Sequence, residues 1–292
     1  MRLRFLKMQA CGNDFVVLDG IAEDLGLGDG ELRQLAVRMC DRRFGVGADG
    51  LLYLMRSSAA DFRMRLFNPD GSEGEMCGNG IRCAVKYYVE RVRPSRRVRV
   101  ETLAGIVEVG VRTVGGVTYY EVDMGVPHLR ARDVPVELRD PDARALGITL
   151  ELPELGKVEL SAVNTGVPHA VIFVDNVDSL DVRRLGRAIR WHPAFPRGVN
   201  VDFAEVVGPR ELKVRTYERG VEDETLCCGT GAAAVAVVAT LLGKVDVGRD
   251  LTLRFRGGTL TLRVLVGAGG EVERITMTGT AHRVFEGVYD PD

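Results

Sequence analysis

Short runs of apolar residues recur at matching places in the two halves of the chain. Residues 15–18 in the first half and 170–174 in the second have the composition of strands. Later in each half, two longer runs flank the pairs Gly115-Gly116 and Gly257-Gly258, which is typical of a hairpin turn. Each half is therefore expected to end in a hairpin. The predicted hairpin strands are residues 106–112 with 117–124, and residues 251–256 with 259–266.

Two helices are predicted in each half. The first follows the early strand, with Asp29 as N-cap of residues 31–40, and with Asp178 or Ser179 as N-cap of residues 180–189. The second begins at a Cys-Gly-x-Gly motif. No alternation of strands and helices of the kind that builds parallel sheets is evident, so antiparallel pairing is favoured.

The predicted helix at residues 230–242 is apolar on nearly every face, because it consists almost entirely of small aliphatic residues. Such a helix must be buried all round, and we expect it to lie inside a curled sheet. The predicted fold class is α+β, with two similar domains, each a mostly antiparallel sheet curled around a central helix.

Three motifs occur twice, in the same order and at similar spacings, which indicates duplication of a unit of roughly 150 residues. Residues 76–80 resemble 227–231, residues 45–49 resemble 198–202, and residues 13–19 resemble 169–175, at offsets of 151, 153 and 156. The predicted domains are residues 1–124 with 278–292, and residues 125–277. The strand after Thr278 would return to complete the first domain.

Composition narrows the possible partners. The chain has 292 residues, 46% of them hydrophobic, and its 39 basic and 41 acidic side chains leave a net charge of -2. A nearly balanced charge favours neither nucleic acid nor an acidic membrane as partner. The first 15 residues hold no continuous apolar segment, and the longest apolar run, residues 232–242, is too short to span a bilayer. A cytoplasmic location is expected, where thiols stay reduced.

Cys77 and Cys228 occupy equivalent positions in the repeat, each at the start of a predicted helix. A helix N-terminus stabilises a thiolate, and the glycines after each cysteine leave amides free to cradle a carboxylate. The cysteines and the four histidines have the spacing of neither a disulfide framework nor a zinc site. Three of the other cysteines, Cys11, Cys40 and Cys83, are interpreted as packing residues. The fourth, Cys227, has no assigned role.

Two equivalent thiols suit a reaction that inverts a carbon centre, because such a reaction needs a base on one face and an acid on the other. Pyridoxal phosphate is not expected, since none of the five lysines lies in a glycine-rich or phosphate-binding context. We therefore predict neither cofactor nor metal, and expect oriented amides to stabilise the carbanion.

Several motifs together resemble those of diaminopimelate epimerases, and the resemblance runs from Lys7 to about Gly287. They are Asn13-Asp14-Phe15, Gly45-Val46-Gly47-Ala48-Asp49-Gly50, Phe67-Asn68, Asp70-Gly71-Ser72-Glu73, Met76-Cys77-Gly78-Asn79-Gly80-Ile81-Arg82-Cys83, Pro168-His169, Tyr217-Glu218-Arg219-Gly220 and Cys228-Gly229-Thr230-Gly231. The resemblance implies an isomerase without a cofactor that interconverts LL- and meso-2,6-diaminopimelate for lysine and peptidoglycan precursors. It also implies an active site in an interdomain cleft, and a homodimer with Phe285 as a candidate interface residue.

The resemblance further implies roles for individual residues. Cys77 and Cys228 would be the base and acid pair, and His169 and Glu218 would tune the pKa of the two thiols. The carboxylate cradle would consist of Gly78, Asn79, Gly229 and Thr230. The substrate's amino groups and distal carboxylate would be held by Asn13, Asn68, Asn200, Glu218 and Arg219. Without the resemblance, Asn68 would be interpreted as a turn residue and Glu218-Arg219 as a surface pair.

Three positions depart from the usual motifs. Gly50 and Val167 stand where one branch of the family has Gln and Asn, which leaves fewer side chains to contact the distal end of the substrate. Cys227 replaces the usual Ala before Cys228. Two other functions stay open: a racemase or epimerase of another amino acid on the same fold, and an amino-acid-binding protein without catalysis.

Overall fold

The computed structural model describes residues 2–152 and 156–290. The chain divides into two compact units, Met1–Val122 with Thr278–Asp292 (unit 1) and Asp123–Met277 (unit 2). The division falls within two strands, β8 (Val117–Gly125) and β17 (Val272–Gly279), through which the chain passes from one unit to the other.

Unit 1 has two helices and the strands that surround them. In chain order these are β1 (Leu3–Ala10), β2 (Asn13–Gly20), α1 (Asp29–Cys40), β3 (Gly50–Met55), β4 (Phe62–Phe67), β5 (Glu73–Gly74), α2 (Gly78–Arg91), β6 (Arg97–Thr102), β7 (Gly105–Val114) and β8, with β18 (His282–Tyr289) at the C-terminal end.

Unit 2 begins with a segment of irregular structure that holds the short 3-10 helix η1 (Ala131–Asp133). Its elements are β9 (Ile148–Leu152), β10 (Gly156–Asn164), β11 (Pro168–Phe173), η2 (Val177–Ser179), α3 (Val182–Arg190), β12 (Asn200–Gly208), β13 (Glu211–Glu218), β14 (Asp223–Thr225), α4 (Gly229–Leu241), β15 (Asp250–Phe255), β16 (Gly258–Val266) and β17. From β10 onward, unit 2 repeats the order of strands and α-helices of unit 1.

The strand pairing is the same in both units. In unit 1, β1–β2, β3–β4, β4–β5 and β6–β7 are antiparallel, while β2–β3 and β4–β6 are parallel. In unit 2, β10–β11, β12–β13, β13–β14 and β15–β16 are antiparallel, while β11–β12 and β13–β15 are parallel. The prediction of two similar, mostly antiparallel domains is confirmed.

The prediction that the chain lacks strand–helix–strand units is wrong. β2-α1-β3 and β11-α3-β12 each join two parallel strands through a helix. Parallel strands require a crossover of this kind. These crossovers place Asp49, directly before β3, and Asp202, in β12, beside the strands that begin near Asn13 and His169.

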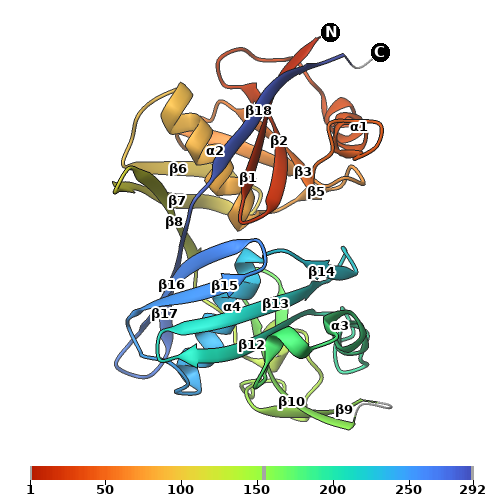
Figure 1. Cartoon of the computed structure of the whole chain (residues 1–292), viewed down its shortest axis with the longest axis vertical. Helices are drawn as coiled ribbons and strands as arrows, with labels where there is room; N and C mark the ends of the chain where they lie inside the picture. Colours follow the sequence, from red (N-terminus) through yellow and green to blue (C-terminus); the bar gives the residue numbers. More distant parts are fainter. Residues whose placement is uncertain (1, 153–155, 291–292) are drawn as a thin grey trace. The chain divides into compact units, whose positions relative to one another are not determined.

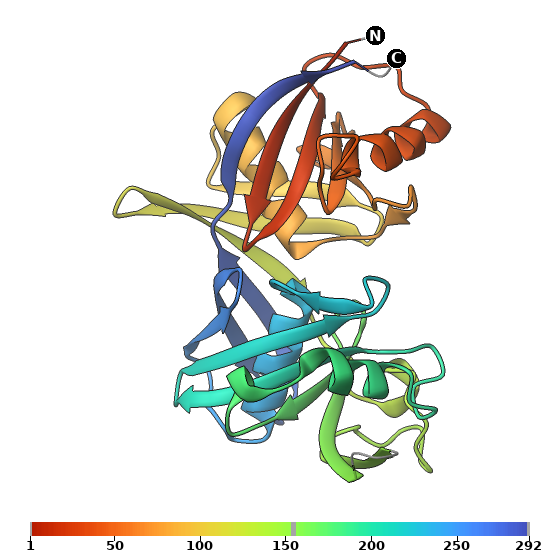
Figure 2. The ribbon, with the colours of Figure 1, turned by 45° about the vertical axis from the view of Figure 1, so that its right-hand side comes forward.

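The C-terminal strand β18 lies beside β1 in unit 1, as both views show (Figures 1 and 2). The two strands are antiparallel, with Leu3 opposite Tyr289 and Gln9 opposite His282. The chain therefore returns from unit 2 to add a strand to the sheet in which it began.

Each unit packs its strands around its second helix. α2 contacts β1, β2, β3, β4, β6 and β18, and α4 contacts β10, β11, β12 and β16 (Figure 1). Of the residues in α4, only Thr230 and Leu241 are not buried. The prediction that this apolar helix lies inside the sheet is confirmed. No helix in the described part of the chain is long and apolar enough to cross a membrane.

Two helix starts and one turn differ from the predictions. Asp29 lies inside α1, whose cap is Gly28, and the Glu31 carboxylate accepts the Gly28 N–H. Asp178 and Ser179 belong to η2, and the backbone of Leu180 is extended. The N-cap of α3 is therefore Asp181, whose carboxylate accepts the Arg184 N–H. Gly258 is already paired with Phe255, so residues 256 and 257 make the hairpin turn.

Candidate active site

Cys77 and Cys228 are the N-cap residues of α2 and α4, and both have extended backbone conformations. The Cys77 Sγ accepts the Gly80 N–H at 3.5 Å, and the Cys228 Sγ accepts the Gly231 N–H at 3.4 Å. Cys228 is buried and Cys77 half-buried. Both sulfurs thus lie against amides of a first helical turn, where partial positive charge stabilises negative charge.

In unit 1, the Asn13 amide joins the Cys77 thiol to a carboxylate. The Asn13 Oδ1 lies 3.6 Å from the Cys77 Sγ and 3.5 Å from the Asn79 Nδ2. The Asn13 Nδ2 donates to Asp49 Oδ2 at 2.7 Å. Asn79 is oriented in turn by the fully buried Arg82, which donates to the Asn79 Oδ1 at 2.7 Å. Each amide therefore has a defined orientation.

A charge network supports Asp49. Arg42 lies 2.7 Å from both Asp14 and Asp49, and the buried Lys7 lies 2.7 Å from Asp14. Burial alone would raise the pKa of Asp14, but hydrogen bonds from Arg42 and Lys7 outweigh it and hold that pKa well below the usual range. The network ties β1 and β2 to the loop that precedes β3.

In unit 2, a chain of hydrogen bonds runs from a buried carboxylate to the second thiol. The His169 Nδ1 lies 2.7 Å from Asp202 Oδ2, and its Nε2 lies 2.9 Å from the Thr230 Oγ1. The same Thr230 Oγ1 lies 3.4 Å from the Cys228 Sγ. His169 and Asp202 are both 0% exposed. The Thr230 hydroxyl therefore bridges the imidazole and this thiol.

Glu218 ends β13 beside the same thiol. Burial raises the pKa of Glu218, while the Thr225 hydroxyl, which donates to its Oε1, opposes that rise. Burial, followed by the charges of Glu218 and Asp202, raises the pKa of Cys228 well above its usual value. At neutral pH these effects favour a protonated Cys228.

Some of the remaining predicted residues contact these two groups and others do not. The Asn200 Oδ1 accepts the Arg219 backbone N–H at 2.8 Å, and the Asn200 Nδ2 lies 3.5 Å from the His169 Nε2. The Arg219 guanidinium donates to the Arg197 carbonyl. Asn68 lies in the turn after β4 and donates to the Ser72 Oγ at 2.9 Å, a local contact. Gly78 and Gly229 are the first residues of their helices.

The structure therefore groups Asn13 and Asn79 with Cys77, and Thr230, His169, Asn200 and Glu218 with Cys228. That both groups serve one substrate stays a prediction.

The other cysteines divide by burial. Cys40 and Cys83 are buried, and burial raises the pKa of each to about 12, which suits packing residues. Cys227 is also buried. Cys11 is half-buried in the turn between β1 and β2, with a φ of 56°, and its interpretation as a packing residue stays a prediction.

Gly50 has a packing reason of its own. A Cβ there would lie 3.1 Å from the Phe67 carbonyl oxygen and 3.2 Å from Leu66 Cδ1. The backbone of β3 therefore approaches β4 too closely at this point for a side chain to fit without a shift.

Sequence reasoning missed four residues of the two groups. They are Asp49, Arg82, Asp202 and Thr216, whose Oγ1 donates to Asp202 Oδ1 at 2.7 Å. A signal for two of them was present, because the duplicated motif aligns Asp49 with Asp202 and keeps a carboxylate in both copies. Arg82 and Thr216 carry no comparable signal, since nothing in their local sequence indicates that they are buried.

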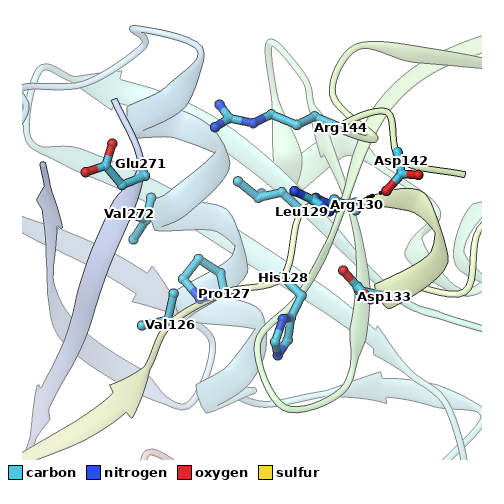
Figure 3. A pocket seen from close by; sticks show the side chains of 10 residues that line it. All are labelled: Val126, Pro127, His128, Leu129, Arg130, Asp133, Asp142, Arg144, Glu271 and Val272. Atoms are coloured by element: carbon cyan, nitrogen blue, oxygen red, sulfur yellow. Dashed lines mark hydrogen bonds and ion pairs between the residues drawn. The ribbon is translucent and has the colours of Figure 1, made fainter. Parts of the chain in front are cut away.

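A surface pocket of about 400 Å³ lies elsewhere in unit 2 (Figure 3). It contains none of the predicted site residues, and its one drawn contact joins Arg130 to Asp142. Its lining residues are Val126, Pro127, His128, Leu129, Arg130, Asp133, Asp142, Arg144, Glu271 and Val272. Neither Cys77 nor Cys228 lines this pocket.

Comparison with known proteins identifies the family. The family model described as "Diaminopimelate epimerase" matches residues 5–130 and 161–284. A diaminopimelate epimerase of Carboxydothermus hydrogenoformans is 44% identical over 98% of this chain and 99% of its own length. One of Pelotomaculum thermopropionicum is 45% identical over 98% and 99%. Among solved structures, a PhzF-family phenazine biosynthesis protein of Bacillus anthracis shares the fold, with a TM-score of 0.74, 18% identity and 99% coverage of both chains.

The family match spans most of the chain, and the relatives match it almost from end to end. The chain belongs to the diaminopimelate epimerase family.

Proposed function

We propose that this protein epimerises LL-2,6-diaminopimelate to meso-2,6-diaminopimelate without a cofactor, as the names of its relatives suggest. The observation that carries the proposal is the pair of equivalent thiols, each the N-cap of a helix that begins Gly-x-Gly. A protein that only bound an amino acid would have no need of two such thiols.

In the proposed reaction, the thiolate of one cysteine removes the α-proton, and the thiol of the other donates a proton to the opposite face of the carbanion. The two cysteines exchange protonation states in each turnover, so the reaction runs in both directions. The raised pKa of Cys228 favours this residue as the proton donor in the resting enzyme and Cys77 as the base.

We propose that first-turn amides of α2 and α4 hold the carboxylate at the reacting carbon, and that their positive ends stabilise the carbanion. Asn13, Asn68, Asn200, Glu218 and Arg219 would hold the amino groups and the distal carboxylate. A guanidinium such as that of Arg219 can bind a carboxylate through two hydrogen bonds.

Proton NMR in D₂O with LL-diaminopimelate tests this function. Deuterium should enter one α-carbon while meso-diaminopimelate forms. Absence of exchange would refute an epimerase of this substrate. Exchange into proline or another amino acid, but not into diaminopimelate, would favour a racemase of different specificity.

We also propose that the protein acts in the cytoplasm as a homodimer, with β18 at the interface. Val284, Phe285 and Val288 are 57%, 46% and 59% exposed, which is unusual for three apolar residues in one strand. Phe285 is held edge-to-face against Phe5 at 5.9 Å, so its orientation is defined.

A further inference from the structure

Asp202 is a fully buried carboxylate with a defined partner for each oxygen. The Thr216 Oγ1 donates to Asp202 Oδ1 at 2.7 Å, and the His169 Nδ1 lies 2.7 Å from Asp202 Oδ2. A Cβ at Gly231 would lie only 2.3 Å from Asp202 Oδ1. The carboxylate therefore lies against the first turn of α4, where the helix dipole favours negative charge.

The neighbours of His169 determine which ring nitrogen carries the hydrogen. A carboxylate only accepts hydrogen bonds, so the Nδ1 that faces Asp202 must be the donor. In neutral imidazole the Nε2 is then an acceptor.

The orientation of Asn200 leads independently to the same tautomer. The Arg219 backbone N–H can only donate, so the Asn200 atom that faces it at 2.8 Å is the carbonyl Oδ1. The Asn200 Nδ2, a donor, is thereby turned toward the His169 Nε2 at 3.5 Å. A donor at that position matches an Nε2 without hydrogen.

The tautomer in turn orients the Thr230 hydroxyl. Thr230 donates its one hydrogen to the His169 Nε2 at 2.9 Å, which leaves its oxygen lone pairs to accept from the Cys228 thiol at 3.4 Å. The hydrogen bonds of Thr230 and His169 therefore point one way, toward Asp202, and the Cys228 thiol lies against both the Thr230 oxygen and Glu218.

We propose, on the basis of the function above, that Asp202 is a positioning residue of the reaction. It holds His169 in the Nδ1–H tautomer, and through Thr230 it keeps the Cys228 thiol aligned for proton donation. Asp202 itself does not contact the substrate.

Unit 1 has a similar arrangement, in which an asparagine takes the place of the histidine. Asp49, which aligns with Asp202, accepts a hydrogen from Asn13, which aligns with His169. The Asn13 Oδ1 is thereby turned toward the Cys77 Sγ. A carboxylate that orients the acceptor of a cysteine is thus common to both units, whereas only unit 2 uses an imidazole.

Nitrogen-15 NMR of the protein labelled at histidine tests the tautomer directly and needs no substrate. His169, assigned by its loss in His169→Gln, should be protonated at Nδ1 in the wild type. In Asp202→Asn, Thr216 would still donate to the amide oxygen, so the amide nitrogen would face Nδ1 and the hydrogen should move to Nε2. Asp49→Asn is the matched control and should leave the His169 tautomer unchanged.

Activity adds a second measurement. Asp202→Asn should lower kcat about 100-fold with little change in KM, as expected when a buried acid that orients a histidine is replaced by an amide. In the His169→Gln background the same substitution should have almost no further effect, because both changes break one chain.

An Nε2–H tautomer in the wild type, an unchanged tautomer in Asp202→Asn, or additive effects of the two substitutions would each overturn the proposal. Failure of the wild type to exchange the α-proton of diaminopimelate would instead refute the proposed function, and the tautomer would be unaffected. If Asp202→Asn does not fold, the wild-type tautomer still decides.

Discussion

Cys77 and Cys228 are equivalent in position but differ in environment. An amide oxygen faces the half-buried Cys77, whereas the buried Cys228 lies near Glu218 and the Thr230 hydroxyl. The duplication thus supplied two similar thiols, and the residues around them made the two chemically different. This difference is what an acid and base pair requires.

Replacement of either cysteine by alanine should abolish epimerisation and leave the fold intact, because each thiol has a separate role on one face of the carbon. Activity can be measured by NMR as above, and folding by circular dichroism. Cys227→Ala is the matched control and should keep activity, since that adjacent thiol has no role in the mechanism. Substantial turnover by Cys77→Ala or Cys228→Ala would contradict the two-thiol mechanism.

The two second glycines of the Cys-Gly-x-Gly motifs differ in what they face. A Cβ at Gly231 would meet Asp202 Oδ1 at 2.3 Å, whereas one at Gly80 would meet the terminal methyl Cδ2 of Leu52 at 3.3 Å. Gly231→Ala should therefore lower stability by about 1–3 kcal/mol. Gly80→Ala should lower stability less, since its closest contact is longer and alanine favours a helix. Thermal melts of the two variants compare them, and equal melting temperatures would show that Asp202 does not lie against α4.

At the scale of elements, the network of Lys7, Asp14, Arg42 and Asp49 joins two strands and a loop. The pKa of Asp14 is lower in the folded protein than its ordinary value of 3.8. A depressed pKa of this kind contributes stability above the ordinary value, and that contribution is lost as the pH falls through the folded value. The network therefore stabilises unit 1 at neutral pH and weakens in acid.

Arg42→Ala should raise the pKa of Asp14 and make the protein less stable than the wild type at neutral pH. The difference in unfolding free energy should be greatest above pH 3.8 and should shrink as the pH falls below it. Urea unfolding at several pH values measures this difference. Arg43→Ala, at the neighbouring exposed arginine, should change the unfolding free energy much less. A difference for Arg42→Ala that is independent of pH would argue against a stabilising ion pair between Arg42 and Asp14.

The apolar helix α4 is an element whose burial follows from composition alone. Val237 of α4 is 0% exposed, whereas Val37 of α1 is 46% exposed. Val237→Ala should cost about 2–3 kcal/mol through lost burial and a cavity, while Val37→Ala should change stability by about 0.5 kcal/mol or less. Denaturant unfolding separates the two, and equal losses would mean that α4 is not packed on all sides.

At the scale of the whole molecule, the chain consists of two copies of one topology, in which β18 pairs with β1 as β9 pairs with β10. The returning strand joins the C-terminal end to β1, so both ends of the chain belong to unit 1. The exposed apolar residues of this strand are the basis for the proposed dimer.

Val288→Asp should convert the proposed dimer to a monomer, because it would place a charge within an apolar contact. Light scattering coupled to gel filtration measures the mass. Val114→Asp, at a similarly exposed valine of β7, is the control and should leave the dimer intact. A wild-type protein that is monomeric at micromolar concentration would contradict the proposal.

Sequence reasoning succeeded where the determining information was local or repeated. The apolar surface of α4 and the duplicated Cys-Gly-x-Gly motifs indicated a buried helix and two helix-start thiols before any contact was known. It failed at the parallel pairs, because they depend on where a distant strand lies. It also failed at the N-cap of α3, because the backbone at Leu180 is extended.

The sequence by itself determined the repeat, the mostly antiparallel fold and the positions of the thiols at helix starts, because periodicity and motif spacing act along the chain. Only the tertiary structure decided which groups face each thiol. Asp202 reaches His169 across the parallel pair β11–β12, and Thr216 reaches Asp202 from the neighbouring β13. Burial in that packing, which no local pattern specifies, is also what raises the pKa of Cys228.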